Sequence, residues 1–222
     1  MTLAAQKIRL ILELRQAGIT DTDILAAVEK SPREMFVPPT FSDRAYDAMA
    51  LPIGHGQTIS QPVVVARMIA ALELNDRIKV LEIGAGSGYQ TAILSYLSRR
   101  VYAIERHRDL LRDAQARLDT LKRYNVTAVV GDGMKGWPDQ APFERIIVSA
   151  AAPVAPEPLV SQLSDGGIMI IPIGDQRRDQ MITRVRREGD NLTTEDLWPV
   201  RFLPLLPGRP EQDSLNNQAA AR

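Results

Sequence analysis

The sequence of 222 residues contains no cysteine, and His55 and His107 are its two histidines. The absence of cysteine excludes a disulfide framework, a thiolate metal site and a cysteine nucleophile. No apolar stretch is long enough to span a bilayer, and the first residues lack the apolar core of a signal peptide. We therefore expect a cytoplasmic protein with no membrane partner and no metal.

The chain also lacks an excess of either charge, because basic and acidic residues balance at 27 each. Nothing marks the whole chain as a nucleic-acid binder, so we predict no nucleic-acid partner. We also expect a monomer. The length suits one sizeable domain with a small appendage. We expect a helical segment and a loop over 1–60, a core over 61–207 that forms one domain with this segment, and a mobile, polar tail over 208–222.

From Lys79 onward, strand patterns alternate with helical patterns, which predicts an α/β fold with a mostly parallel sheet and helices on both faces. The expected helices are Leu3–Ala17, a second one capped by Asp21, Val63–Leu72, Gly88–Leu97 and Arg108–Leu121. The expected parallel strands are Lys79–Ile83, Arg100–Ile104, Thr127–Val130, Glu144–Ser149 and Ile168–Ile173. Met181–Arg187 and Trp198–Leu205 lack an intervening helix, so we expect them to pair antiparallel at one edge. Prolines around Arg33–Val37 predict an extended connector.

The strand at Val80 opens directly into a glycine turn that carries Glu82, Gly84, Gly86, Ser87 and Gly88. Glycine lets the backbone turn sharply and approach a ligand, and a following helix aims free N–H groups at ligand oxygens. The next strand ends at Glu105, an acid placed to accept hydrogen bonds from ribose hydroxyls. Together these features predict a nucleotide-like cofactor.

The glycine spacing separates possible cofactors. A dinucleotide fingerprint is G-x-G-x-x-G, whereas here the third glycine comes one residue early and Tyr89 stands in its place. This weakens the case for a nicotinamide or flavin cofactor. The pattern E-x-G-x-G-x-G resembles motif I of S-adenosylmethionine-dependent methyltransferases, in which Glu82 would lie near the positive end of the cofactor.

A second informative segment runs from Leu51 to Pro62 and is rich in glycine, hydroxyl and amide groups. Backbone groups of such a loop are free to contact a ligand. Ser60 has two possible roles. It is a good N-cap for the helix that follows, or its hydroxyl positions a substrate at the cofactor.

Six motifs in order resemble those of the protein-L-isoaspartate O-methyltransferase family, in its bacterial type. They are Arg33-Glu34-x-Phe36-Val37-Pro38, Leu51 to Pro62, the glycine motif with Tyr89, Gly131-Asp132-Gly133, Ala150-Ala151-Ala152-Pro153, and Gln162 to Gly174 with its paired glycines. The resemblance covers most of the chain. It implies a Rossmann-like methyltransferase fold and methyl transfer from S-adenosylmethionine to the α-carboxylate of L-isoaspartyl residues in damaged proteins and peptides, leaving S-adenosylhomocysteine.

The same resemblance assigns roles to individual residues. Ser60 would be catalytic, as a hydrogen-bond donor that orients the carboxylate. Residues of the cofactor site would be Gln57, Thr58, Ile59, Glu82, Gly84, Gly86, Ser87, Gly88, Glu105, Asp132 and Gly133. Glu105 would hold the ribose, and Asp132 with the backbone of Gly133 would meet the adenine.

Other functions stay open on the sequence. A methyltransferase of another substrate and a NAD-binding oxidoreductase are the enzymatic alternatives. The third alternative is a protein that binds S-adenosylmethionine or damaged chains without catalysing a reaction. Asp132 is also a good turn residue, and Glu105 could simply end its strand.

Overall fold

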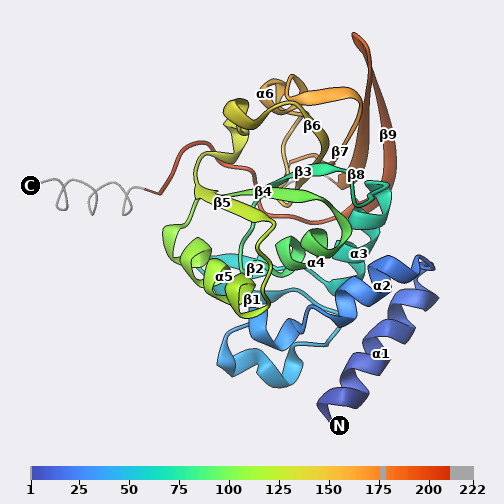
Figure 1. Ribbon diagram of the computed structural model, residues 1–222, viewed down its shortest axis with the longest axis vertical. Coiled ribbons are helices and arrows are strands. Elements are labelled where there is room, and N and C mark those ends of the chain that lie inside the picture. The colour runs from blue at the N-terminus through green and yellow to red at the C-terminus, as the bar shows by residue number, and fades with distance from the viewer. Residues whose placement is uncertain (1, 176–178, 211–222) are drawn as a thin grey trace, which may run out of the picture.

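The computed structural model describes residues 2–175 and 179–210. Its main sheet has seven strands in the order β5-β4-β3-β6-β7-β8-β9 (Figure 1). Their bounds are β3 Lys79–Ile83, β4 Arg100–Glu105, β5 Val126–Val130, β6 Phe143–Val148, β7 Leu163–Ile173, β8 Gln180–Glu188 and β9 Asn191–Val200. Strands β3 to β7 pair in parallel, while β8 pairs antiparallel with β7 and β9 with β8. The predicted fold class is confirmed.

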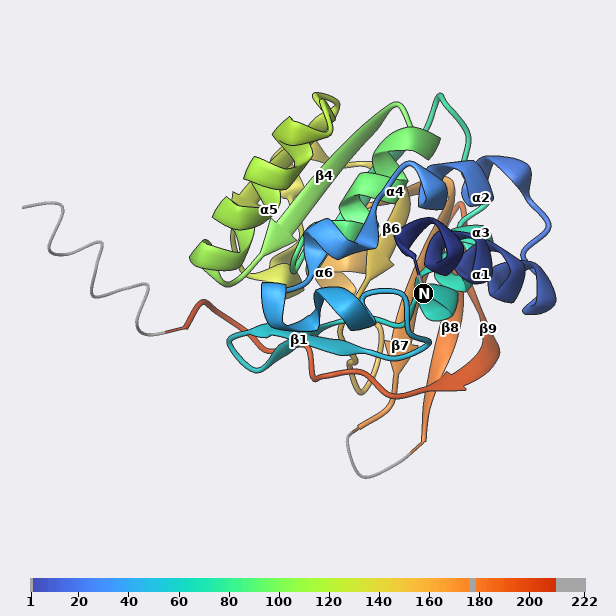
Figure 2. The same ribbon diagram turned by 90° about the horizontal axis from the view of Figure 1, so that it is seen from below.

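Helices cover both faces of this sheet (Figures 1 and 2). They are α1 Leu3–Gln16, α2 Thr22–Glu29, α3 Pro62–Ala71, α4 Tyr89–Leu97, α5 Arg108–Thr120 and the short α6 Glu157–Val160. Side chains alternate between the faces along a strand. Val80 of β3 accordingly joins one buried cluster with α3 and α4, whereas Leu81 joins another with Leu159 of α6.

The N-terminal helices belong to the first of these clusters, since Leu10 and Leu14 of α1 and Val28 of α2 are buried in it. The side chain of Asp21 caps α2 by accepting from the backbone N–H groups of Asp23 and Ile24, as predicted. The proposed boundaries at residues 60 and 207 stay predictions. Of the predicted tail, 211–222 lie outside the described residues. In the portion of the chain that the structure describes, no helix has the length and apolarity needed to cross a membrane.

The prediction for the segment between the prolines was wrong. Arg33–Phe36 forms a 3-10 turn, η1, where an extended connector was expected. The prolines that flank it forbid a longer α-helix but allow a short i to i+3 turn. Further 3-10 turns are η2 Pro39–Arg44, η3 Gly133–Lys135 and η4 Pro138–Gln140.

The last strand lies earlier in the chain than predicted. Strand β9 ends at Val200, and it turns back from β8 through Gly189 at φ 60° and Asp190. Its first six residues are exposed and, apart from Leu192, polar, so they show no apolar pattern. Residues 201–205, predicted to lie in the strand, instead leave the sheet and run beside a small hairpin (Figure 2).

That hairpin consists of β1 Leu51–Gly54 and β2 Gln57–Ile59, which pair antiparallel where only a loop was foreseen. Gly54, His55 and Gly56 all have positive φ and make the tight turn. Leu51 and Ile59 face each other in the register and are both buried, so the hairpin is anchored by its base. Its polar tip is left to face the carboxyl ends of the parallel strands.

Candidate active site

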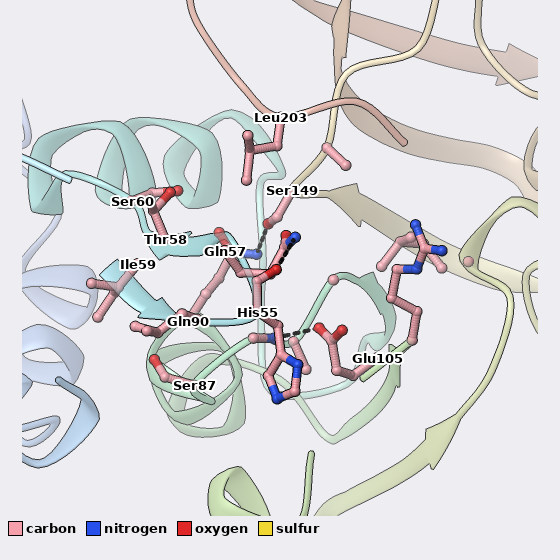
Figure 3. A pocket seen from close by; sticks show the side chains of 18 of the residues that line it. His55, Gln57, Thr58, Ile59, Ser60, Ser87, Gln90, Glu105, Ser149 and Leu203 are labelled. Atoms are coloured by element: carbon pink, nitrogen blue, oxygen red, sulfur yellow. Dashed lines mark hydrogen bonds between the residues drawn. The ribbon is translucent and has the colours of Figure 1, made fainter. Parts of the chain in front are cut away.

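A cavity of about 330 Å³ lies at the carboxyl ends of β3, β4 and β6. Ligands of open α/β sheets bind at this edge, where the chain leaves each strand for a loop. Its walls include the β1–β2 hairpin, the turn after β3 with the start of α4, the ends of β4 and β6, and the strip 203–206. Figure 3 shows side chains from these segments converging on one space.

The turn after β3 brings backbone close to the cavity. Gly86 has φ 55°, and a Cβ there would lie 3.2 Å from Ile53 Cδ1 of the hairpin, so the two segments pack without room for a side chain. Four amides of this turn are already used within the protein. The N–H groups of Gly84 and Ala85 donate to Ile104 O, that of Gly86 to Glu105, and that of Gly88 to Ala85 O. These four amides are therefore not free to bind a ligand; the prediction that the following helix directs free N–H groups at ligand oxygens stays a prediction.

Glu105 ends β4 at the cavity wall and is 5% exposed. Its Oε2 accepts from the N–H of Gly86 at 2.8 Å and its Oε1 from the N–H of His107 at 3.0 Å. An ionised carboxylate offers about four lone-pair positions, so two remain for a ligand. The carboxylate, labelled in Figure 3, is thus fixed in place by backbone N–H groups of two segments, the glycine turn and the residues after β4.

Glu82 lies behind the wall rather than on it. It is wholly buried, and its Oε1 accepts from Gln90 Nε2 at 3.0 Å. The same Gln90 nitrogen donates to Ser149 Oγ at 2.9 Å (Figure 3). Gln90 and Ser149 both line the cavity, so they form a polar partition between it and Glu82. Burial raises the pKa of Glu82 to about 7.

Tyr89 is a second buried polar residue at the wall, and Arg33 supports it from behind. The guanidinium of Arg33 lies 5.0 Å from the centre of the Tyr89 ring, a cation–π contact. Arg33 Nε also donates to Ala45 O at 2.7 Å, and the side chain is fully buried. Burial lowers the pKa of Arg33 and raises that of Tyr89. Arg33 therefore joins the segment leading to the hairpin with the first residue of α4.

The two histidines meet at the edge of the cavity. His55, at the hairpin tip, stacks on His107 with ring centres 4.8 Å apart and an interplanar angle of 28°. His55 Nε2 also lies 3.9 Å from Asp109 Oδ2 of α5. His107 is the N-cap residue of α5, and it is partly covered by this stack.

A second cavity of about 550 Å³ adjoins the first. The residues shared by the two walls are Gln57, Thr58, Ser60, Ser149 and Leu203. Ser60 does not cap the following helix, because Gln61 is the N-cap residue of α3 and makes no side-chain cap bond. The prediction of an N-cap role was wrong, and the hydroxyl of Ser60 instead belongs to the junction of two cavities.

Most of the predicted site residues line the first cavity: Gln57, Thr58, Ile59, Ser60, Gly84, Gly86, Ser87, Glu105 and Gly133. Glu82, Gly88 and Asp132 do not. Gly88 begins α4 with φ 90° and packs against Ala114, where a Cβ would lie 3.0 Å from that side chain. Asp132 Oδ1 accepts from the N–H of Met134, which is the turn role noted from the sequence.

Sequence reasoning missed Gln90, Ser149 and the strip 203–206. Gln90 carried a signal, because it lies eight residues after the acid of the glycine motif and at the start of the following helix. The strip carried none, since its apolar residues read equally well as a strand. Within the described residues, no group of three or more His, Asp or Glu side chains is placed to hold a metal ion.

Comparison with known proteins gives a consistent result. The protein-L-isoaspartate(D-aspartate) O-methyltransferase family model matches residues 5–209. The protein-L-isoaspartate O-methyltransferase of Rhodospirillum centenum is 59% identical over 208 residues, which are 93% of this chain and 94% of that protein. The enzyme of the same name from Rhodospirillum rubrum is 57% identical over 216 residues, 96% of this chain and 99% of that protein.

Solved structures agree on the fold. A protein-L-isoaspartate O-methyltransferase matches with a TM-score of 0.82 at 27% identity, covering 96% of this chain and 69% of that one. A Plasmodium falciparum structure, described as a candidate of the same kind in complex with S-adenosyl-L-homocysteine, has a TM-score of 0.76 at 24% identity and covers 89% and 97%. Because the family model spans nearly the whole chain and the relatives exceed half identity, this chain belongs to the protein-L-isoaspartate(D-aspartate) O-methyltransferase family.

Proposed function

We propose that this protein transfers a methyl group from S-adenosylmethionine to the free α-carboxylate of L-isoaspartyl residues in damaged proteins and peptides. The observation that carries this proposal is the meeting of two cavities at Ser60. One is bounded by the glycine turn and Glu105, and the other by Gln180 and the chain at 199–203. A methyl donor and a peptide acceptor need such adjoining spaces.

The first cavity suits S-adenosylmethionine. Glu105 presents an ordered carboxylate for ribose hydroxyls, and the apolar Ile104 and Leu205 with the bare backbone of Gly133 offer a flat slot for adenine. A Cβ on Gly133 would lie 2.5 Å from Ile83 Cγ2, so glycine keeps this slot clear. Ser87 and Gln90 would hold the amino-acid end. The relative from Plasmodium falciparum binds S-adenosyl-L-homocysteine, the product of such a cofactor.

The residues at the junction would orient the acceptor. When bound, S-adenosylmethionine supplies a methyl group on a positively charged sulfur. An isoaspartyl carboxylate has an ordinary pKa of about 4, so it is ionised at neutral pH and needs no general base. Ser60 would donate a hydrogen bond to one carboxylate oxygen and aim the other. Thr58 and Leu203 would exclude water, and alignment of this kind contributes roughly 7 to 11 kcal/mol.

The glycine turn argues against a dinucleotide. Binding a pyrophosphate requires free backbone donors at the turn and helix start. Here the amides of Gly84, Ala85, Gly86 and Gly88 donate to protein acceptors. These four positions offer no donor to a pyrophosphate, and together with the early third glycine this favours a cofactor that lacks one.

Further predictions from the sequence belong to this proposal. We infer that the protein acts as a monomer in the cytoplasm and binds no nucleic acid. The balance of 27 basic and 27 acidic residues supports the last point. The roles given to Glu82, Gly88 and Asp132 narrow to support of the wall, since none of them lines the cavity.

The test is methyl transfer from labelled S-adenosylmethionine to matched peptides with isoaspartyl or normal aspartyl at one position. We expect label in the isoaspartyl peptide alone, as a base-labile ester. Label in both peptides would indicate another acceptor specificity. Label in neither, with S-adenosylhomocysteine still bound in calorimetry, would reduce the protein to a binder.

A further inference from the structure

The wall of the second cavity is neutral except for one basic side chain. Its walls comprise Ala50, Gln57, Thr58, Ser60, Gln61, Val64, Ser149, Gln180, Pro199, Val200, Arg201, Phe202 and Leu203. Arg201 is the one charged residue among them. An acceptor peptide whose carboxylate is at Ser60 has to place its neighbouring residues along this wall.

Arg201 is held at the rim by its neighbours. The buried side chain of Gln180 binds both backbone groups of Phe202, accepting from its N–H at 2.6 Å and donating to its carbonyl at 3.2 Å. One step further along, the N–H of Ala151 donates to Leu203 O at 2.8 Å. The backbone of Phe202 and Leu203 is therefore fixed directly after Arg201, while the Arg201 side chain is exposed.

The charge of Arg201 is not neutralised by any acid in the part of the chain that the structure describes. Among the described residues, no Asp or Glu forms an ion pair with it, whereas Arg184 and Arg186 of β8 both pair with Glu73. An unpaired guanidinium at the rim of a neutral cavity attracts anionic groups and repels cations. Selection of this kind acts on the charge of the peptide residues that neighbour the isoaspartyl residue.

We propose that Arg201 is a specificity-determining residue that makes the enzyme prefer isoaspartyl sites with an acidic neighbour over sites with a basic neighbour. This inference rests on the proposed function, because it assigns the flanking peptide to the second cavity. Arg201 acts on binding of the peptide and does not touch the reacting atoms. The expected preference is modest, roughly threefold for each side chain that pairs with it, as for an exposed ion pair.

The test uses isoaspartyl peptides that differ only in having Asp, Asn or Lys beside the isoaspartyl residue, on either side. Kd is measured by calorimetry with S-adenosylhomocysteine present, and KM and kcat by methyl transfer. For the unmodified chain we expect Kd and KM to rise in the order Asp, Asn, Lys with kcat unchanged. Higher salt should reduce the spread, since it screens exposed charges.

Variants separate the charge from the shape of the residue. Arg201→Glu should reverse the order, a swing of roughly tenfold between the Asp and Lys peptides, while Arg201→Lys should keep the order. Arg99→Glu is the matched control. Arg99 is also exposed, but it lies at the amino end of β4, away from both cavities, and we expect the original order to persist.

Two results would overturn the inference. One is equal Kd and KM for the three peptides with the unmodified chain, while isoaspartyl is still distinguished from aspartyl. The other is an unchanged order in Arg201→Glu. Failure to methylate any isoaspartyl peptide would instead contradict the proposed function itself, so the two failures are distinguishable.

Discussion

The two cavities that meet at Ser60 are built in different ways. The first contains a block of local chain, β3 with its glycine turn and the end of β4, held by backbone hydrogen bonds to Glu105 and Ile104. Both cavities are also walled by the hairpin and by the chain beyond β9, which are separated by more than a hundred residues. The cofactor site thus has one locally fixed wall, whereas the second cavity, proposed for varied peptides, is assembled from distant segments and lacks that block. Variants that affect one cavity and spare the other test this division.

The largest effect is expected at Ser60, on the acceptor side. Ser60→Ala removes the donor that orients the carboxylate, and by analogy with other catalytic hydrogen-bond donors we expect kcat to fall roughly 100-fold. The Kd for S-adenosylhomocysteine should change little, because Glu105, Ser87 and Gln90, which would hold the cofactor, are unchanged. Steady-state methyl transfer and calorimetry on the same sample check both points. Ser161→Ala, on the far end of α6, is the control, and a kcat equal to that control would remove Ser60 from the mechanism.

The stability of the protein should depend on pH through Glu82, which lies behind the wall of the first cavity. The pKa of Glu82 is raised from 4.5 to about 7 by burial, so the folded state favours the protonated form. Glu82 therefore lowers stability as pH rises from its unfolded pKa toward 7, and the cost is complete above that value, amounting to about 3 kcal/mol.

Glu82→Gln lacks this titration. The stability of the variant relative to the unmodified chain should therefore increase by about 2.5 kcal/mol between about pH 5 and about pH 8. Urea unfolding at the two pH values measures the difference. Glu188→Gln, exposed at the end of β8, should show no such change. A pH-independent difference for Glu82→Gln would mean that Glu82 is ionised in the folded protein.

On the cofactor side, Glu105→Gln keeps the shape of the side chain but removes its charge. Hydrogen bonds to a charged group contribute about 1.5 to 3 kcal/mol, so we expect roughly 10- to 100-fold weaker binding of S-adenosylhomocysteine. Calorimetry gives the Kd, and the KM for peptide at saturating cofactor should stay close to its original value. An equal loss in both would show that the two cavities are not separable at this residue.

The smallest effect concerns the stack that joins the hairpin to the cofactor wall. An aromatic pair contributes about 0.5 to 1.5 kcal/mol, so His55→Ala and His107→Ala should each weaken S-adenosylhomocysteine binding roughly two- to tenfold. The double variant should lose no more than the stronger single variant, because both changes break one contact. Additive losses would show that each histidine acts separately.

The sequence predicted the parts of the site that are formed by neighbouring segments and missed those that depend on contacts between distant segments. Gly84, Gly86 and Glu105 were found because β-α-β geometry fixes where a glycine turn and the next strand end must meet. Gln180 and Phe202 could not be found, because their hydrogen bonds link β8 to the chain beyond β9. Arg33 was noticed in a motif, yet its contact with Tyr89 depends on how the N-terminal segment packs on α4.

The sequence by itself determined the alternation of strands and helices, the glycine turn, the acid at the end of β4 and the likeness to a methyltransferase family. These are properties of neighbouring residues, whose spacing is set by backbone geometry. The tertiary structure alone decided that Glu82 and Asp132 lie off the cavity, that the amides of the glycine turn are occupied, and that Ser60 stands between two spaces. Those features depend on which distant surfaces pack together, and many sequences with the same local pattern would pack them differently.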